Sequence, residues 1–181
     1  AHAEMMWGLK QTMSEELPAL FARHGMEPAK LEQMRPHLDS FIPLVSPQPE
    51  LQIVRPEDEF RWGDQTFRAI ETSGHAAGHL CFYNERENVM ICGDHVLPQI
   101  TPNVSLLPGS DPDPLHSFLT GLNQLRTYEV RCAFPGHRDP FSRWTERIDQ
   151  IVRHHDERLA RIIALLDRPA TAYMVCVKLF G

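Results

Sequence analysis

The sequence lacks several features that would place it in a special class. It has no apolar run near the ~18 residues that a membrane span requires, no internal repeat and no low-complexity tract. It also lacks an excess of positive charge, because 18 Lys and Arg stand against 24 Asp and Glu, a formal net charge of -6. This balance argues against a general binder of nucleic acid or of anionic membranes. With 42% hydrophobic and 23% charged residues, the 181-residue chain has the composition of an ordinary globular protein.

Cysteine is sparse and shows no C-x-x-C pair. The four cysteines are Cys81, Cys92, Cys132 and Cys176, each in an apolar run, which predicts buried free thiols in a reducing compartment. The N-terminal residues show no basic segment followed by an apolar stretch, so we expect no signal peptide. These observations together predict a cytoplasmic location and no membrane partner.

The N-terminal third predicts helices. Apolar residues recur at helical spacing over residues 1–23, Gly25 and Pro28 end that pattern, and a second helix is expected over 28–38. We interpret the Met-rich face of the first helix as core filler or as a lid over a pocket. The predicted first region, 1–49, is therefore a helical region bordering a site.

The second predicted region, 50–142, changes to the two-residue period of strands. Two hairpins are indicated, one around Gly63 and Asp64 and one around a charged turn near residue 86. A long proline-rich loop over 95–114 and a helix over 114–127 separate them from a last strand. The predicted strands are 51–54, 59–62, 66–71, 79–83, 88–92 and 130–134. The apolar strands of the second hairpin predict a sheet covered on both faces, and the fold class is an α/β sandwich with a mainly antiparallel sheet.

The third predicted region, 143–181, is helical. One apolar stripe predicts a long amphipathic helix over 143–166. Thr171 is a typical N-cap for a short last helix that runs to the end of the chain.

Three segments share one design, in which a glycine turn carrying a histidine or an aspartate adjoins an apolar strand. They contain His75 and His79, then Asp94 and His95, then His137. If the strands are neighbours in one sheet, their ends bring these side chains together. Imidazole and carboxylate groups suit Zn²⁺, Mn²⁺ or Fe²⁺.

The order of these segments resembles the metallo-β-lactamase superfamily. The resemblance lies in Thr72-Ser73-Gly74-His75-Ala76-Ala77-Gly78-His79, then Gly93-Asp94, then Pro135-Gly136-His137. Gly93-Asp94-His95-Val96-Leu97-Pro98 with Thr101-Pro102-Asn103 is similar to a hydrolase branch related to glyoxalase II-like and endoribonuclease-like enzymes. That branch carries a C-terminal winged-helix-like tail, which the last helix resembles. The resemblance covers about residues 50–181 and implies the αββα sandwich of the superfamily.

The resemblance also implies roles for single residues. His75 matches a ligand of a first metal, Asp94 the catalytic carboxylate that bridges two ions, and His137 a ligand of the second. His79 matches a histidine that supports the ligands. His95 follows the bridging carboxylate, where it either supports the ligands, faces the substrate or is an ordinary polar residue of the loop. The implied cofactor is a pair of Zn²⁺ ions, with Mn²⁺ or Fe²⁺ as alternatives, and the implied reaction is attack of a bridging hydroxide on an ester, thioester or lactone.

One motif of the superfamily, His-x-His-x-Asp-His, does not occur in this sequence. Its nearest lookalike, His154-His155-Asp156, falls within the predicted long helix, where we expect His155 to face the core and His154 to be exposed. We therefore expect the chain to be the later part of a longer protein, with an incomplete sandwich. We also expect weak metal binding, little hydrolysis by this chain alone, and self-association through the uncovered sheet.

Two other functions remain open at this point. The first is a single-strand RNA endonuclease of the same fold, for which Arg138, Arg143 and Arg147 are candidate RNA contacts, although they are also typical of a solvated helix start. Arg138 stands where many relatives have glycine. The second is a non-catalytic interaction module.

Overall fold

The computed structural model describes residues 13–40, 43, 47 and 50–181. The chain divides into two compact units, and each is described by itself. One contains residues 53–106 and 110–155, and the other contains 107–109, 156–181 and the described residues up to 52. Residues 1–12, the first half of the predicted N-terminal helix, lie outside the described residues. The region boundaries expected at residues 49 and 142 stay predictions.

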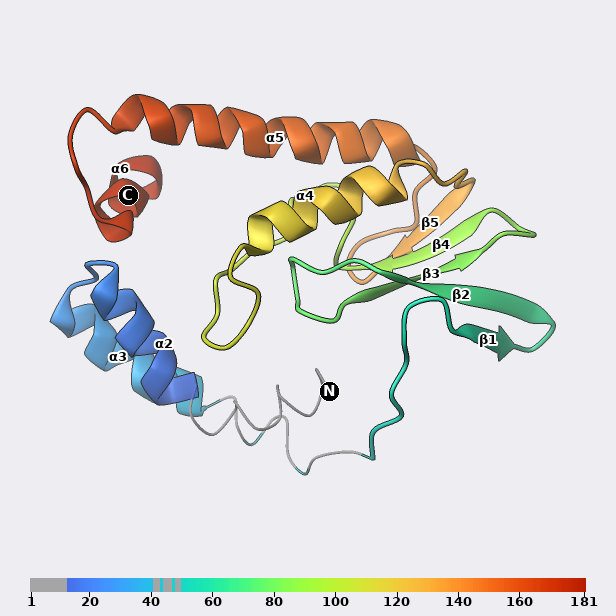
Figure 1. Cartoon of the computed structure of the whole chain (residues 1–181), viewed down its shortest axis with the longest axis horizontal. Helices are drawn as coiled ribbons and strands as arrows, with labels where there is room; N and C mark the ends of the chain where they lie inside the picture. The colour runs from blue at the N-terminus through green and yellow to red at the C-terminus, as the bar shows by residue number, and fades with distance from the viewer. Residues whose placement is uncertain (1–12, 41–42, 44–46, 48–49) are drawn as a thin grey trace. The chain divides into compact units, whose positions relative to one another are not determined.

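The larger unit is built on a five-stranded mixed sheet in the order β1-β2-β3-β4-β5 (Figure 1). The strands are β1 Glu59–Trp62, β2 Gln65–Glu71, β3 Leu80–Asn84, β4 Val89–Gly93 and β5 Cys132–Pro135. The first four pair antiparallel, so both predicted hairpins are confirmed, whereas β4 and β5 run parallel. A parallel pair requires a crossover, and the loop and helix between β4 and β5 provide it.

One predicted strand is wrong. Residues 51–54 form no strand, because no backbone hydrogen bond pairs them with β1, the outermost strand on that side, or with another described residue. The chain bonds to β2 just before β1 begins, where the backbone N–H of Glu57 donates to the carbonyl of Ala69 and the backbone N–H of Ala69 donates to the carbonyl of Asp58. The last strand also begins later than predicted, at Cys132, since Arg131 turns to donate its backbone N–H to the carbonyl of Asn88.

Two helices cover one face of this sheet (Figure 1). Helix α4 spans Pro114–Leu125, and the Asp113 carboxylate caps it by accepting from the backbone N–H of His116 at 3.1 Å. Helix α5 spans Trp144–Leu165 and begins in this unit. The buried residues that they share with the sheet are Ile70, Cys81, Tyr83, Met90, Cys92, Phe118, Leu122, Leu125, Ala133, Trp144, Ile148 and Ile151.

The other face of the sheet is apolar and partly exposed. The register places Phe82 beside Ile91, and Ile91 beside Phe134. At the β1 edge, the rings of Trp62 and Phe82 lie 5.9 Å apart. Trp62 is 52% exposed and Phe134 is 43% exposed. Within the described residues of this unit, the expectation of a sheet covered on both faces therefore holds for one face only.

The smaller unit is helical. It contains α2 Met13–Arg23, α3 Pro28–Asp39, the second half of α5, and α6 Ala172–Phe180. The hydroxyl of Thr171 accepts from the backbone N–H of Met174 at 3.2 Å, which confirms the predicted N-cap of the last helix. The backbone N–H of Tyr173 donates to the carbonyl of His24 at 3.1 Å, and this bond joins the start of α6 to the end of α2.

All four cysteines are free thiols, as predicted, but only Cys81 and Cys92 are buried. Cys132 is half-buried and Cys176 is exposed. No helix in the described part of the chain is both long enough and apolar enough to cross a membrane.

Candidate metal centre

Strand direction brings the three ligand-bearing segments to one edge of the sheet. Strands β2 and β4 both run antiparallel to β3, which lies between them, and β5 is parallel to β4. The carboxyl ends of β2, β4 and β5 therefore meet. The backbone N–H of Gly136 donates to the carbonyl of Gly93 at 2.8 Å, which aligns the Gly-Asp turn with the Pro-Gly-His turn.

Two histidines face one aspartate at this edge. The Nε2 atom of His75 lies 3.7 Å from Oδ2 of Asp94, and the Nε2 atom of His137 lies 3.4 Å from the same oxygen. The second carboxylate oxygen of Asp94, Oδ1, is buried and has no hydrogen-bond partner among the described residues. A Cβ on Gly136 would collide with this Oδ1, so only glycine lets the neighbouring turn come this close to the carboxylate.

The ring of His75 is oriented from its far side. Its Nδ1 lies 2.7 Å from the backbone carbonyl oxygen of Asn103. Since a carbonyl only accepts, the Nδ1–H tautomer is the one that makes this bond, and Nε2 is left with its lone pair towards Asp94. Metal-binding histidines are commonly held in this way by a bond to the other ring nitrogen. Sequence reasoning gave Asn103 no role, because a backbone carbonyl leaves no signal in residue type.

His79 lies behind this group. Its Nδ1 is 2.8 Å from the hydroxyl oxygen of Thr72, and its Nε2 lies so close to Gly93 that a Cβ there would be 2.6 Å away. Gly93 has φ of 48°, so both its conformation and this contact require glycine. Burial lowers the pKa of His79 to about 4, with the nearby His75 adding to the effect and Asp94 opposing it.

His95 is completely buried. Its ring packs against Phe118 of α4 at 4.7 Å and against His79 at 5.7 Å. Burial lowers its pKa to about 3, and the positive charge that His79 and His75 can carry lowers it further. Neither ring nitrogen makes a well-formed hydrogen bond to a described residue, although backbone groups of Thr72 and Phe118 lie near enough to oppose the shift slightly. The ring has no exposed surface through which to face a substrate.

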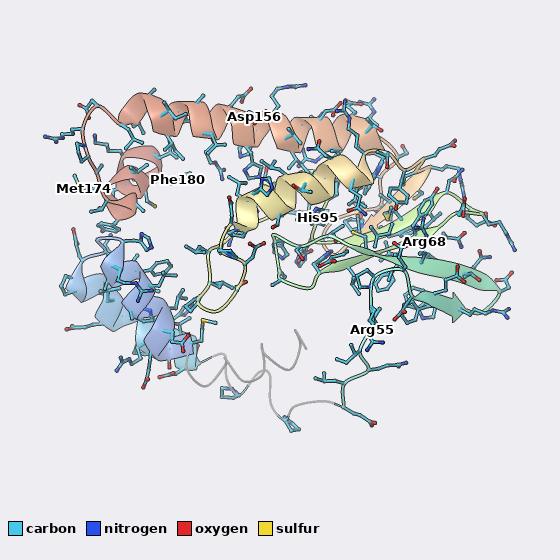
Figure 2. All side chains as sticks on the ribbon, in the orientation of Figure 1. Arg55, Arg68, His95, Asp156, Met174 and Phe180 are labelled. Atoms are coloured by element: carbon cyan, nitrogen blue, oxygen red, sulfur yellow. The ribbon has the colours of Figure 1, made fainter. Side chains whose placement is uncertain are left out.

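The lookalike segment in α5 does not contribute to this edge. His155 is buried as predicted, and its ring lies 5.5 Å from that of Phe118. His154 is half-buried rather than exposed. Asp156 follows in the middle of the same helix (Figure 2).

The donor set fits a divalent metal ion, since it combines imidazole nitrogens with a carboxylate that has an unsatisfied buried oxygen. Within the described residues, however, no three His, Cys, Asp or Glu side chains are grouped to hold one ion. His75 and His137 both face Asp94. An ion beside either histidine would therefore have two side-chain ligands, that histidine and Asp94. Catalytic zinc sites use three.

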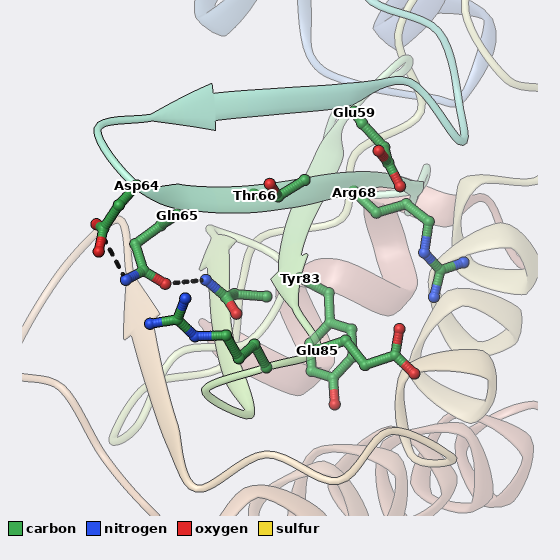
Figure 3. A pocket seen from close by; sticks show the side chains of 9 residues that line it. Glu59, Asp64, Gln65, Thr66, Arg68, Tyr83 and Glu85 are labelled. Carbon is green, nitrogen blue, oxygen red and sulfur yellow. Dashed lines mark hydrogen bonds between the residues drawn. The ribbon is translucent and has the colours of Figure 1, made fainter.

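A cavity of about 400 Å³ lies elsewhere, at the opposite end of the sheet (Figure 3). Gln65 lines it and donates to the carboxylate of Asp64 at 3.2 Å, and it accepts from the amide of Asn84 at 2.9 Å. These residues begin β2 and end β3, whereas the histidines follow β2 and precede β3. The cavity is therefore separate from the candidate metal centre.

Comparison with known proteins agrees with this geometry. Residues 9–137 match the family model described as the metallo-beta-lactamase superfamily. Because this match includes more than half of the chain, the chain belongs to the metallo-β-lactamase superfamily. The match begins well before residue 50, where the resemblance in the motifs begins, and it ends at His137. The superfamily generally binds divalent metals.

Similar proteins support the same assignment. A metallo-β-lactamase family protein of Thermus thermophilus shares 32% identity at a TM-score of 0.76, over 90% of this chain and 52% of its own. The atrochrysone carboxyl ACP thioesterase of Emericella nidulans is 28% identical over 76% of this chain and 42% of its own length. A probable metallo-hydrolase of Bacillus subtilis is 28% identical over 65% of this chain and 39% of its own. The chain thus spans about half the length of such relatives, or less.

Proposed function

We propose that this chain forms part of a metal-dependent hydrolase that holds two divalent ions of the Zn²⁺ type and cleaves an ester, thioester or lactone. The observation that carries the proposal is the placement of two histidine Nε2 atoms against one oxygen of Asp94, at the meeting point of three strand ends. The thioester alternative gains support from relatives that are named thioesterases.

The residues divide the work as follows. His75 and Asp94 would hold one ion, and His137 and Asp94 the other. A bound divalent ion supplies a Lewis acid and lowers the pKa of bound water towards neutrality. The carbonyl of Asn103 holds the proton of His75 on Nδ1 and so keeps Nε2 available as a donor. His79 fills the space behind Asp94, and its low pKa keeps it neutral at pH 7.

We further propose that this chain alone binds metal weakly and hydrolyses little. Each ion would have two side-chain ligands from the described residues, and water would have to complete the rest of each coordination shell. Zn²⁺ titration by calorimetry tests this expectation. Micromolar or tighter binding that Asp94→Asn abolishes would contradict it.

The hydrolase proposal is tested with the natural-length protein. Turnover of a panel of activated thioesters, esters and lactones is measured with Zn²⁺, with Mn²⁺ and with chelator, and single-stranded RNA serves as a further candidate substrate. We expect metal-dependent turnover that Asp94→Asn abolishes. The matched control is Asp64→Asn, which changes the other Gly-Asp turn, at the far end of the sheet. Turnover no higher than with chelator, or equal loss in both variants, would refute the proposal.

A further inference from the structure

The loop after β4 connects two parts of the candidate metal centre, the carboxylate of Asp94 and the carbonyl that binds His75. It starts directly after Asp94 and runs through irregular backbone to Asn103, whose carbonyl binds His75. No backbone–backbone hydrogen bond to another described residue holds the stretch 97–103. The backbone carbonyls of this stretch therefore need side-chain partners, and such partners also determine where the carbonyl of Asn103 lies.

Arg147 supplies these bonds from α5. Its Nε donates to the carbonyl of Leu97 at 2.6 Å, and its Nη2 donates to the carbonyl of Ile100 at 2.9 Å. The remaining terminal nitrogen, Nη1, donates to the side chain of Gln150 one turn further along the helix, at 3.1 Å. All three guanidinium nitrogens are therefore engaged. Arg147 was a candidate RNA contact in the sequence, but its donors are directed at the protein's own loop.

The chemistry of the side chain suits this task. A guanidinium is a rigid planar fork, so it fixes the separation and direction of the two carbonyls that it binds. Leu97 and Ile100 are three residues apart, and Asn103 is three residues beyond Ile100. The fork is anchored by Gln150 to a helix whose first turns belong to the buried core, where Trp144 and Ile148 pack.

We propose that Arg147 is a positioning residue for the candidate metal centre. It holds the loop 97–103 on α5 and thereby holds the Asn103 carbonyl that selects the Nδ1–H tautomer of His75. Loss of the fork lets the loop move, and the His75 ring loses the partner that fixes its proton and its direction. The consequence for metal binding rests on the proposed function, whereas the consequence for the tautomer of His75 does not.

The test reads the tautomer directly. Nitrogen-15 NMR of the metal-free chain, at about pH 8 where imidazoles are neutral, reports which ring nitrogen of His75 carries the proton. We expect Nδ1–H in the wild type and in Arg143→Gln, and a shift to mixed or Nε2–H signals in Arg147→Gln. Arg143 is the matched control because it lies one turn earlier, directly before the same helix, and its side chain is 81% exposed. Arg147→Lys keeps the positive charge but loses the planar fork, and we expect this variant to shift the tautomer as well. It replaces Arg147→Gln in the test if that variant does not fold.

An unchanged Nδ1–H signal in a folded Arg147→Lys or Arg147→Gln variant overturns the proposal, and so does an equal change in Arg143→Gln. A loss of stability alone would not move the tautomer of His75. In the natural-length protein we expect Zn²⁺ affinity to fall about tenfold or more in Arg147→Gln, as for other partners that orient metal ligands. A shifted tautomer without any metal binding leaves the role of Arg147 standing and refutes the proposed function instead.

Discussion

Acid should destabilise the sheet unit through two histidines that the fold keeps neutral. His79 and His95 have pKa values of about 4 and about 3, mainly because both rings are buried. A free histidine has a pKa of about 6.5, so below that pH the unfolded chain binds more protons than the folded one. Stability is therefore fully present above about pH 6.5 and is lost as the pH falls towards the folded values.

The size of the loss follows from the two values. Each pKa unit corresponds to about 1.4 kcal/mol, so at about pH 5 each ring costs about 2 kcal/mol relative to neutral pH. The two losses together reach about 4 kcal/mol, a large part of the roughly 5–15 kcal/mol that typical domains possess.

Urea unfolding at several pH values between about 7.5 and 5 measures this effect. Chelator is present throughout, so that metal binding does not contribute. We expect His79→Asn to remove about half of the pH dependence, and His116→Asn, which changes a histidine at the start of α4, to leave it unchanged. The reasoning is wrong if the wild type is equally stable across this range, or if His79→Asn retains the full slope.

Three further predictions test other features of the chain. Arg138 adopts φ of 74°, a backbone conformation that glycine adopts without strain. Arg138→Gly should therefore raise the free energy of unfolding, measured in urea, by up to about 1 kcal/mol, whereas Arg138→Ala should not. A thiol reagent added to the native protein should modify the exposed Cys176 first. It should not modify Cys81 until the protein unfolds, because burial raises the pKa of the Cys81 thiol to about 12. Rapid labelling of Cys81 would count against this packing. The apolar sheet face should drive self-association, so Phe134→Ser should lower the sedimentation coefficient at high concentration, and a wild type that is monomeric throughout would disprove the idea.

Much of the sheet unit could be predicted from the sequence, because its signals are local. Two-residue alternation and the turn at Gly63 identified the first hairpin, and apolar runs identified the second. The same signals misled at residues 51–54, where a short apolar run has the composition of a strand but no place in the sheet. A strand forms only where its backbone pairs with a neighbouring strand, and local sequence does not report that pairing.

The supporting contacts of the site could not be predicted for a different reason. His75, Asp94 and His137 stand out because few residue types bind metal and each follows a glycine turn at a strand end. The bond that orients His75 comes from the backbone carbonyl of Asn103, and Arg147 bonds to the backbone carbonyls of Leu97 and Ile100 in the same loop. Every residue type possesses such a carbonyl. A carbonyl acquires a specific role only from the folded path of its loop, so that role has no signature in the sequence.

The parallel pairing of β5 connects the fold to the site. Had β5 run antiparallel to β4, the Pro-Gly-His turn would follow its strand at the opposite edge, one strand length from Asp94. The parallel direction requires a crossover, and that crossover contains both the loop that carries Asn103 and helix α4, whose Phe118 covers His95. The parallel pairing of β4 and β5 therefore brings His137 to Asp94. Its crossover also provides the loop that orients His75 and the helix that buries His95. For this reason, a change that loosens α4 should disturb the candidate centre even where it touches no proposed ligand.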